Sequence, residues 1–163
     1  MSRIDFVTGA PLRYMPLVDA LATVPDRVEA VLRRHPGAHF HRAPAGGDWA
    51  PSRVLAHMLS YARHNGGFIY MITWMTDPVR PAWDEEAEIE AEGWLRLDAS
   101  RAVEALRELI APTVELLSTT PDASWGRPGG HPRDGRRSLR QQVQAHIDHL
   151  EEHTRQIDAA FPA

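Results

Sequence analysis

The chain has 163 residues, of which 43% are hydrophobic and 25% are charged, and its formal net charge at pH 7 is −4. It contains no cysteine and no lysine, which excludes disulfides, thiolate metal sites, a cysteine nucleophile, and Schiff-base or P-loop lysine chemistry. Because there is no membrane-spanning apolar run, no signal-like start over residues 1–6 and no basic excess, we expect one cytoplasmic domain over residues 1–163, without membrane or nucleic-acid partners.

Helical periodicity dominates the chain from its first third onward. The first helix is predicted over residues 18–34, with Pro25 as a kink, and it ends at residues 35–37, where proline and glycine follow a histidine. The second is predicted to begin at Pro51, a residue favoured in the first helical turn, and to run to about Met75. Its inward stripe would comprise Val54, His57, Tyr61, His64, Phe68, Met71 and Met75.

A long connector follows the second helix and spans residues 76–97. It holds six acidic residues between positions 84 and 92, and we expect this run to be an exposed connector or a surface helix. The third helix is predicted over residues 98–117, with Pro112 as a bend.

The last third of the chain combines a loop with a helix. Residues 119–135 are rich in glycine and proline and are predicted to be loop. The fourth helix is predicted over residues 138–160, because Ser138 and Gln141 fit the capping-box pattern. We interpret the basic cluster at this junction as a solvated loop and not a DNA-binding patch; it comprises Arg133, Arg136, Arg137 and Arg140. Four long helices without alternating strand patterns indicate an all-α four-helix bundle with a long crossover connection between helices 2 and 3.

The nine histidines are the residues that point to chemistry. His146, His149 and His153 fall on the core-facing sector of the fourth helix, where an imidazole nitrogen needs a partner. His149 and His153, four residues apart, can converge on one metal ion, and so can His146 and His149. His146 and His153 are separated by about 10 Å along the helix axis, which is too far for one ion. One pair therefore ligates, and the third histidine supports a ligand, has a structural role or lies at the mouth of the site.

A third ligand has to come from another helix, and His57 on the stripe of the second helix is the best candidate. The alternative for His57 is a core histidine bonded to a backbone carbonyl, and for His64 this alternative is preferred. The remaining histidines fall in predicted loops and are expected to be solvated; they are His35, His39, His41 and His131.

Residues 49–57 (WAPSRVLAH) and 149–157 (HLEEHTRQI) together resemble the DinB/YfiT-like superfamily of damage-inducible bundle proteins. The shared features are a tryptophan before the second helix, a histidine on that helix, and H-x-x-x-H followed by Gln-Ile. With the connector and the loop before the last helix, the resemblance covers residues 15–160. It implies a four-helix bundle, common homodimers, and a divalent metal held by His57, His149 and His153. Nickel or zinc is the expected metal, with iron or manganese as the alternatives.

The chain departs from this superfamily at two positions. Ala50 stands where a serine often caps the second helix, so we expect Asp48 or Ser52 to satisfy the helix start. Ala145 stands where an additional histidine is usual, and His146 is displaced by one residue, which puts a shared role for His146 in doubt.

The resemblance also implies a class of function, because characterised relatives include bacillithiol transferases and mycothiol-dependent maleylpyruvate isomerase. We expect a divalent-metal-dependent transferase that uses a low-molecular-weight thiol as a small-molecule substrate. A metal-dependent hydrolase and a non-enzymatic metal-binding stress-response protein are the alternatives. Because the chain lacks cysteine, the reactive sulfur would arrive with the substrate. Arg53, Arg63 and Arg107 are candidates to bind a carboxylate of that thiol, and Arg155 is a weaker one.

The segment 149–153 also fits H-x-x-E-H, the inverted zinc-protease motif, in which Glu152 would be the general base. This interpretation is disfavoured because no sheet is predicted and Glu152 lies about 100° round the helix from His153.

Overall fold

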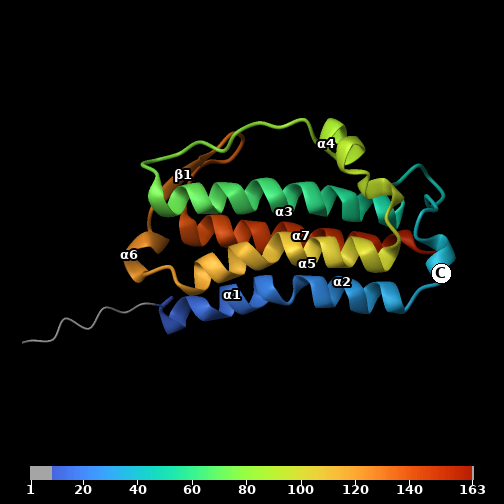
Figure 1. The fold of residues 1–163 in the computed structure, drawn as a ribbon, viewed down its shortest axis with the longest axis horizontal. Helices are drawn as coiled ribbons and strands as arrows, with labels where there is room; N and C mark the ends of the chain where they lie inside the picture. Colours follow the sequence, from blue (N-terminus) through green and yellow to red (C-terminus); the bar gives the residue numbers. More distant parts are fainter. Residues whose placement is uncertain (1–8, 163) are drawn as a thin grey trace, which may run out of the picture.

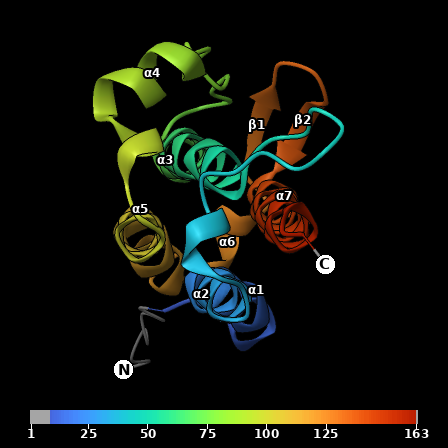
Figure 2. The same ribbon diagram turned by 90° about the vertical axis from the view of Figure 1, so that its right-hand side faces the viewer.

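The computed structural model describes residues 9–162 and is built mainly from helices that run side by side (Figure 1). Viewed end-on, four helical elements occupy the corners of a bundle (Figure 2). These elements are the consecutive helices α1 (Met15–Ala22) and α2 (Val24–Arg33), then α3 (Pro51–Trp74), α5 (Ala99–Ser118) and α7 (Leu139–Ala160). The predicted bundle, with its long connection between the second and third of these elements, is confirmed.

None of the helices in the described part combines the length and apolar character needed to cross a membrane. Residues 1–6, on which the expectation about a signal sequence rests, lie outside the described residues.

The first bundle element differs from the single kinked helix that we expected. A short 3-10 turn (Leu12–Tyr14) leads into α1, so the element begins earlier than residue 18. It then breaks at Thr23, and Pro25 lies in the first turn of α2, where its missing N–H costs no hydrogen bond.

The starts of α3 and α7 are stabilised in different ways. Ala50 caps α3 without a side-chain hydrogen bond. The expectation that Asp48 or Ser52 would supply one is wrong, because the Ser52 backbone N–H instead donates to the Phe40 carbonyl at 2.9 Å. At α7 the predicted capping box is confirmed: the Gln141 N–H donates to Ser138 Oγ at 3.2 Å, and the Ser138 N–H donates to Gln141 Oε1 at 2.9 Å.

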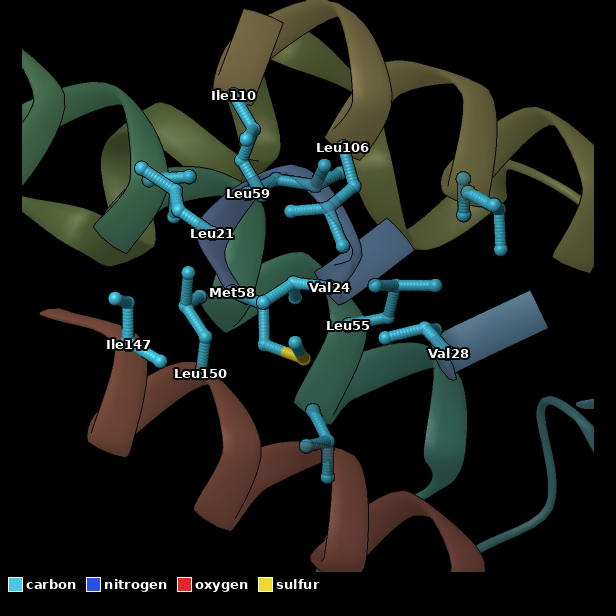
Figure 3. Packing of buried hydrophobic residues seen from close by; sticks show 14 of the residues in the cluster. Leu21, Val24, Val28, Leu55, Met58, Leu59, Leu106, Ile110, Ile147 and Leu150 are labelled. Atoms are coloured by element: carbon cyan, nitrogen blue, oxygen red, sulfur yellow. The ribbon is translucent and has the colours of Figure 1, made fainter. Parts of the chain in front are cut away.

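The core lies between all four bundle elements, and Figure 3 shows part of its packing. Its labelled side chains are at most 3% exposed; they are Leu21, Val24, Val28, Leu55, Met58, Leu59, Leu106, Ile110, Ile147 and Leu150. The stripe predicted for α3 is confirmed in part, since Val54 and Phe68 are buried in the core. His57 and Tyr61 of that stripe are only half-buried, and the core also takes the unpredicted Leu55, Met58 and Leu59. Two sides of α3 are covered, one by the bundle and one by the connector, which obscures the helical periodicity.

The connector runs back along α3 and ends in the short helix α4 (Glu85–Glu92) and a 3-10 turn (Trp94–Arg96) (Figure 1). The Asp84 side chain caps α4 by accepting from the Ala87 N–H at 3.0 Å. Of the two expectations for the acidic run, an exposed connector or a surface helix, the structure confirms the surface helix.

The segment predicted as loop after α5 contains regular structure. A short helix α6 (Asp122–Trp125) is followed by strands β1 (Pro128–His131) and β2 (Gly135–Ser138), which pair antiparallel with Pro128 opposite Ser138. A strand pattern was not visible because β1 is mostly glycine and proline. In the basic cluster, Arg133 lies in the hairpin turn, Arg136 and Arg137 lie on β2, and Arg140 lies in the first turn of α7. The expected loop is therefore wrong for β2, whereas all of these arginines except the half-buried Arg137 are exposed, as a solvated segment requires.

Candidate metal centre

Three of the nine histidines meet in one place. His57 of α3 and His149 and His153 of α7 each offer one nitrogen, and these three atoms lie within 4.8 Å of one another. The Nε2 atoms of His57 and His149 are 3.1 Å apart. The His153 ring centroid lies 4.5 Å from that of His57 and 4.4 Å from that of His149. Spacing of four residues on α7 turns two rings toward the same side, and α3 supplies the third.

Two of these rings are held through their Nδ1 atoms. His57 Nδ1 lies 2.8 and 2.9 Å from the two carboxylate oxygens of Glu85, which can only accept, so this nitrogen carries the proton. His153 Nδ1 lies 2.6 Å from Gln156 Oε1, also an acceptor. Both rings therefore turn an unprotonated Nε2 toward the cluster. A second hydrogen bond of this kind fixes the tautomer and orientation of histidines that bind metals.

Burial favours the neutral form of the two histidines that α7 contributes. Burial, followed by the neighbouring His153 and His57, lowers the pKa of His149 to about 3. Burial is also the largest cause of the lowered pKa of His153. Neutral imidazoles with their lone pairs directed at a common point are suited to a divalent cation. The donor set thus fits such an ion by its chemistry as well as by its distances.

His146 and His64 lie outside this cluster. His146 is 1% exposed and stacks on Tyr61 at a centroid distance of 5.4 Å, and burial lowers its pKa to about 4. Its Nδ1 has no hydrogen-bond partner within residues 9–162. His64 Nε2 lies 3.0 Å from both carboxylate oxygens of Glu88, and its ring stacks on Trp83 at 4.3 Å. The expectation that His64 bonds to a backbone carbonyl is therefore wrong, because its partner is the carboxylate of Glu88.

Two histidines expected to be solvated are not. His35 Nε2 lies 2.7 Å from Asp158 Oδ1, and the ring stacks on Phe161 at 4.1 Å. The His131 side chain in β1 is 10% exposed, and its Nδ1 accepts from the Asp134 N–H at 3.1 Å. Burial is the main cause of its lowered pKa. His41 is exposed, as expected, and His39 is half-buried.

A cavity of about 450 Å³ opens beside the cluster. His57, His149 and Tyr61 line one side of it, and the Tyr61 ring stacks on His149 at 3.7 Å. The connector and the β-hairpin supply the rest of the wall, including Arg80 and His131. A small molecule in this cavity would lie against two of the three clustered histidines.

The arginines of the cavity are not the ones that the sequence suggested. Arg53 pairs with Glu86, and Arg107 Nη1 lies 2.6 Å from Asp26 Oδ1. Neither lines the cavity, nor do Arg63 and Arg155; the arginines that do are Arg80, Arg133 and Arg137.

A model of the DinB superfamily matches residues 20–157 of the chain. The chain belongs to the DinB superfamily. Among solved structures, YfiT from Bacillus subtilis, described as a probable metal-dependent hydrolase with an unusual four-helix bundle topology, has a TM-score of 0.68 at 20% identity, over 96% of this chain and 92% of that one. Mycothiol-dependent maleylpyruvate isomerase has a TM-score of 0.69 at 12% identity, over 91% of this chain and 60% of that one.

At these identities the two likenesses show the fold that this DinB-superfamily chain shares with those proteins. A mutant of the same isomerase gives a TM-score of 0.70 at 11% identity. A comparison with curated proteins found no significant match.

The carboxylates that bind His57 and His64 were not predicted from the sequence. Glu85 holds His57, and Glu88 accepts from His64 and from the Ser60 hydroxyl at 2.5 Å. Both belong to the acidic run that was expected to be an exposed connector or a surface helix. The capping residue Asp84 predicts that a helix starts here, but nothing in the run shows which acids turn inward.

The zinc-protease interpretation finds no support in the geometry. Glu152 is exposed, whereas His149 and His153 on either side are half-buried. The sheet within the described residues is one two-stranded hairpin.

Proposed function

We propose that this chain is a divalent-metal-dependent enzyme in which His57, His149 and His153 hold the ion. The observation that carries the proposal is the convergence of three nitrogens within 4.8 Å, at the edge of a cavity large enough for a small substrate. Glu85 and Gln156 support it, since each leaves an Nε2 lone pair directed at the cluster. Nitrogen ligands favour nickel or zinc, with iron and manganese as further candidates.

The reaction that we propose is a group transfer that uses a low-molecular-weight thiol. An ion held by three neutral imidazoles keeps its double charge and an open position, where it lowers the pKa of a thiol or a water molecule. The chain has no cysteine, so the thiol belongs to the substrate. The shared fold of the mycothiol-dependent isomerase supports this class, although the chain spans about 60% of that protein.

A metal-dependent hydrolase is the second candidate. The observation that favours it is the likeness to YfiT, which extends over 92% of that protein. YfiT is described as a probable metal-dependent hydrolase. The adjoining cavity supports either enzyme over a purely structural metal site, because a structural ion is normally closed off by its ligands. We further propose one domain that acts as a cytoplasmic homodimer, which light scattering of the purified chain and cell fractionation would test.

The first experiment is metal analysis of protein purified without an affinity tag. We expect about one divalent ion per chain in the wild type and a loss of about tenfold or more in metal affinity for His57→Ala and His153→Ala. His64→Ala is the matched control, because His64 binds Glu88 and not the cluster, and it should keep its metal. Undiminished metal content in both cluster variants would contradict the proposed site.

The second experiment separates the two reaction classes. Cobalt-substituted protein is titrated with small thiols and, separately, assayed with activated esters. A thiol-dependent change in the visible spectrum supports the transferase. Ester hydrolysis that is abolished by a chelator, together with a spectrum that thiols leave unchanged, would replace it with the hydrolase.

A further inference from the structure

Three arginines line the same cavity as His57 and His149; they are Arg80, Arg133 and Arg137. Two carboxylates also line the cavity, but both are engaged. Glu85 is bound to His57, and Asp134 Oδ2 lies 2.8 Å from Arg137 Nη2. The acids therefore do not neutralise the whole wall.

Arg80 is the half-buried arginine of the cavity without an ion pair to any residue between positions 9 and 162. Arg133 also has none within this range, but it is exposed. The Arg80 Nη1 donates to Asn65 Oδ1 at 3.2 Å, and its guanidinium lies 4.9 Å from the centroid of Trp83. Both neighbours are neutral, so they orient the group without cancelling its charge.

Buried groups hold this guanidinium in place. Asn65 is 0% exposed, and its Oδ1 also accepts from Gln142 Nε2 at 3.2 Å. Burial is the largest cause of a lowered pKa of Arg80, and it outweighs the opposing effects of Tyr61 and Asp134. Leaving a half-buried charge unpaired costs stability, which a bound anion would offset.

The backbone of Arg80 is fixed as well. Its N–H donates to the Gly130 carbonyl at 3.0 Å, and the Gly130 N–H donates to the Pro78 carbonyl at 2.8 Å. These bonds attach the connector to the hairpin that carries Arg137.

We infer that Arg80, with Arg137 beside it, binds a carboxylate group of the substrate and so directs the substrate's reactive end toward the three histidines. The planar fork of an arginine matches a carboxylate. A single half-buried guanidinium without an ion pair suits a single negative charge, because Arg137 is already shared with Asp134 and Arg133 is exposed. The inference rests on the proposed function, which supplies the substrate.

The test compares a charged ligand with its uncharged analogue. Protein as purified is titrated with 3-mercaptopropionate and with 3-mercaptopropionamide, and binding is followed by NMR of ¹⁵N-labelled arginine side chains. We expect the carboxylate to bind about tenfold more tightly than the amide, the scale of one charge-assisted pair. The preference should fall to less than about twofold in Arg80→Gln and by a smaller factor in Arg80→Lys, which keeps the charge but loses the fork.

Arg101→Gln is the matched control, because Arg101 is exposed on α5 and its side chain has no partner within residues 9–162. It should keep the full preference. Equal binding of the two ligands by the wild type, or a preference that survives in both Arg80 variants, would overturn the inference.

A second arm separates this outcome from failure of the proposed function. His57→Ala is titrated with propionate and propionamide, which carry no thiol. The preference for propionate should persist there, because Arg80 is not part of the histidine cluster. If the wild type binds no metal but this preference is present, the metal proposal fails and the carboxylate site stands. Loss of the preference in His57→Ala overturns the carboxylate site whatever the metal content.

Discussion

The buried imidazole of His146 makes a sharp prediction about stability and pH. In the folded chain its pKa is lowered from 6.5 to about 4 by burial, whereas in the unfolded chain the ring is solvated and titrates near its ordinary value. Above about pH 6.5 both states are neutral, and the contribution of His146 to stability is fully present. As the pH falls toward 4, the unfolded state takes up a proton that the folded state does not, so the free energy of unfolding decreases.

The size of this effect follows from the two pKa values. Their difference is worth about 3 kcal/mol in full, and about 2.5 kcal/mol of it is lost by about pH 4.5. His146→Leu removes the titrating group from a site that is 1% exposed and has an unpartnered Nδ1 in the described structure. Relative to the wild type, we expect the variant to gain about 2.5 kcal/mol between about pH 7 and about pH 4.5.

The assay is urea unfolding at several pH values with a chelator present, so that metal binding does not enter the comparison. Other groups with lowered pKa values, such as His153 and Glu88, affect both proteins alike and cancel in the difference. His41→Leu, at an exposed position, is the control and should follow the wild-type curve. Parallel stability curves for the wild type and His146→Leu would refute the argument that burial depresses the pKa of this ring.

Two further predictions concern the support of the site. Glu85→Gln removes the charged acceptor of the His57 Nδ1 proton and should weaken metal binding by about 10- to 100-fold, measured by calorimetric titration; unchanged affinity would show that Glu85 does not orient the ring. Gly129→Ala would place a Cβ 2.6 Å from Ile72 Cγ1 and should destabilise the chain by about 1–3 kcal/mol in urea unfolding. Gly126→Ala, which meets open space, should have little effect, and equal stability of the two variants would contradict the steric argument.

The bundle could be predicted from the sequence because its signals are local. Pro51 and the Ser138 capping box mark helix starts that the structure confirms, and the core positions of α7 recur at helical spacing. The prediction for α3 was less accurate because two of its sides are covered, so apolar residues surround much of the helix. The β-hairpin was missed because its strands depend on pairing with each other and with the connector, and Gly129 and Gly130 carry no strand signal of their own.

The histidine cluster could be predicted for a related reason. His149 and His153 are one helical turn apart, so their proximity follows from the local sequence. Predicting that His57 joins them required only the assumption that α3 packs on α7. The partners of the cluster were not predictable in this way, because Glu85 lies 28 positions from His57 and meets it through the path of an aperiodic connector.

If the proposed function holds, the same distinction between the bundle and the segments outside it determines which residues select the substrate. The bundle helices supply the clustered histidines, but Arg80 and Glu85 come from the connector, and Arg137 comes from the hairpin. Segments outside the bundle tolerate changes in length and sequence better than packed helices do, because fewer buried contacts depend on them. A change in the connector would therefore alter the charge that faces a substrate without disturbing the three nitrogens. On this argument, exchanging connectors between members of the superfamily should change ligand preference while leaving metal affinity intact, provided that the glutamate at position 85 is kept.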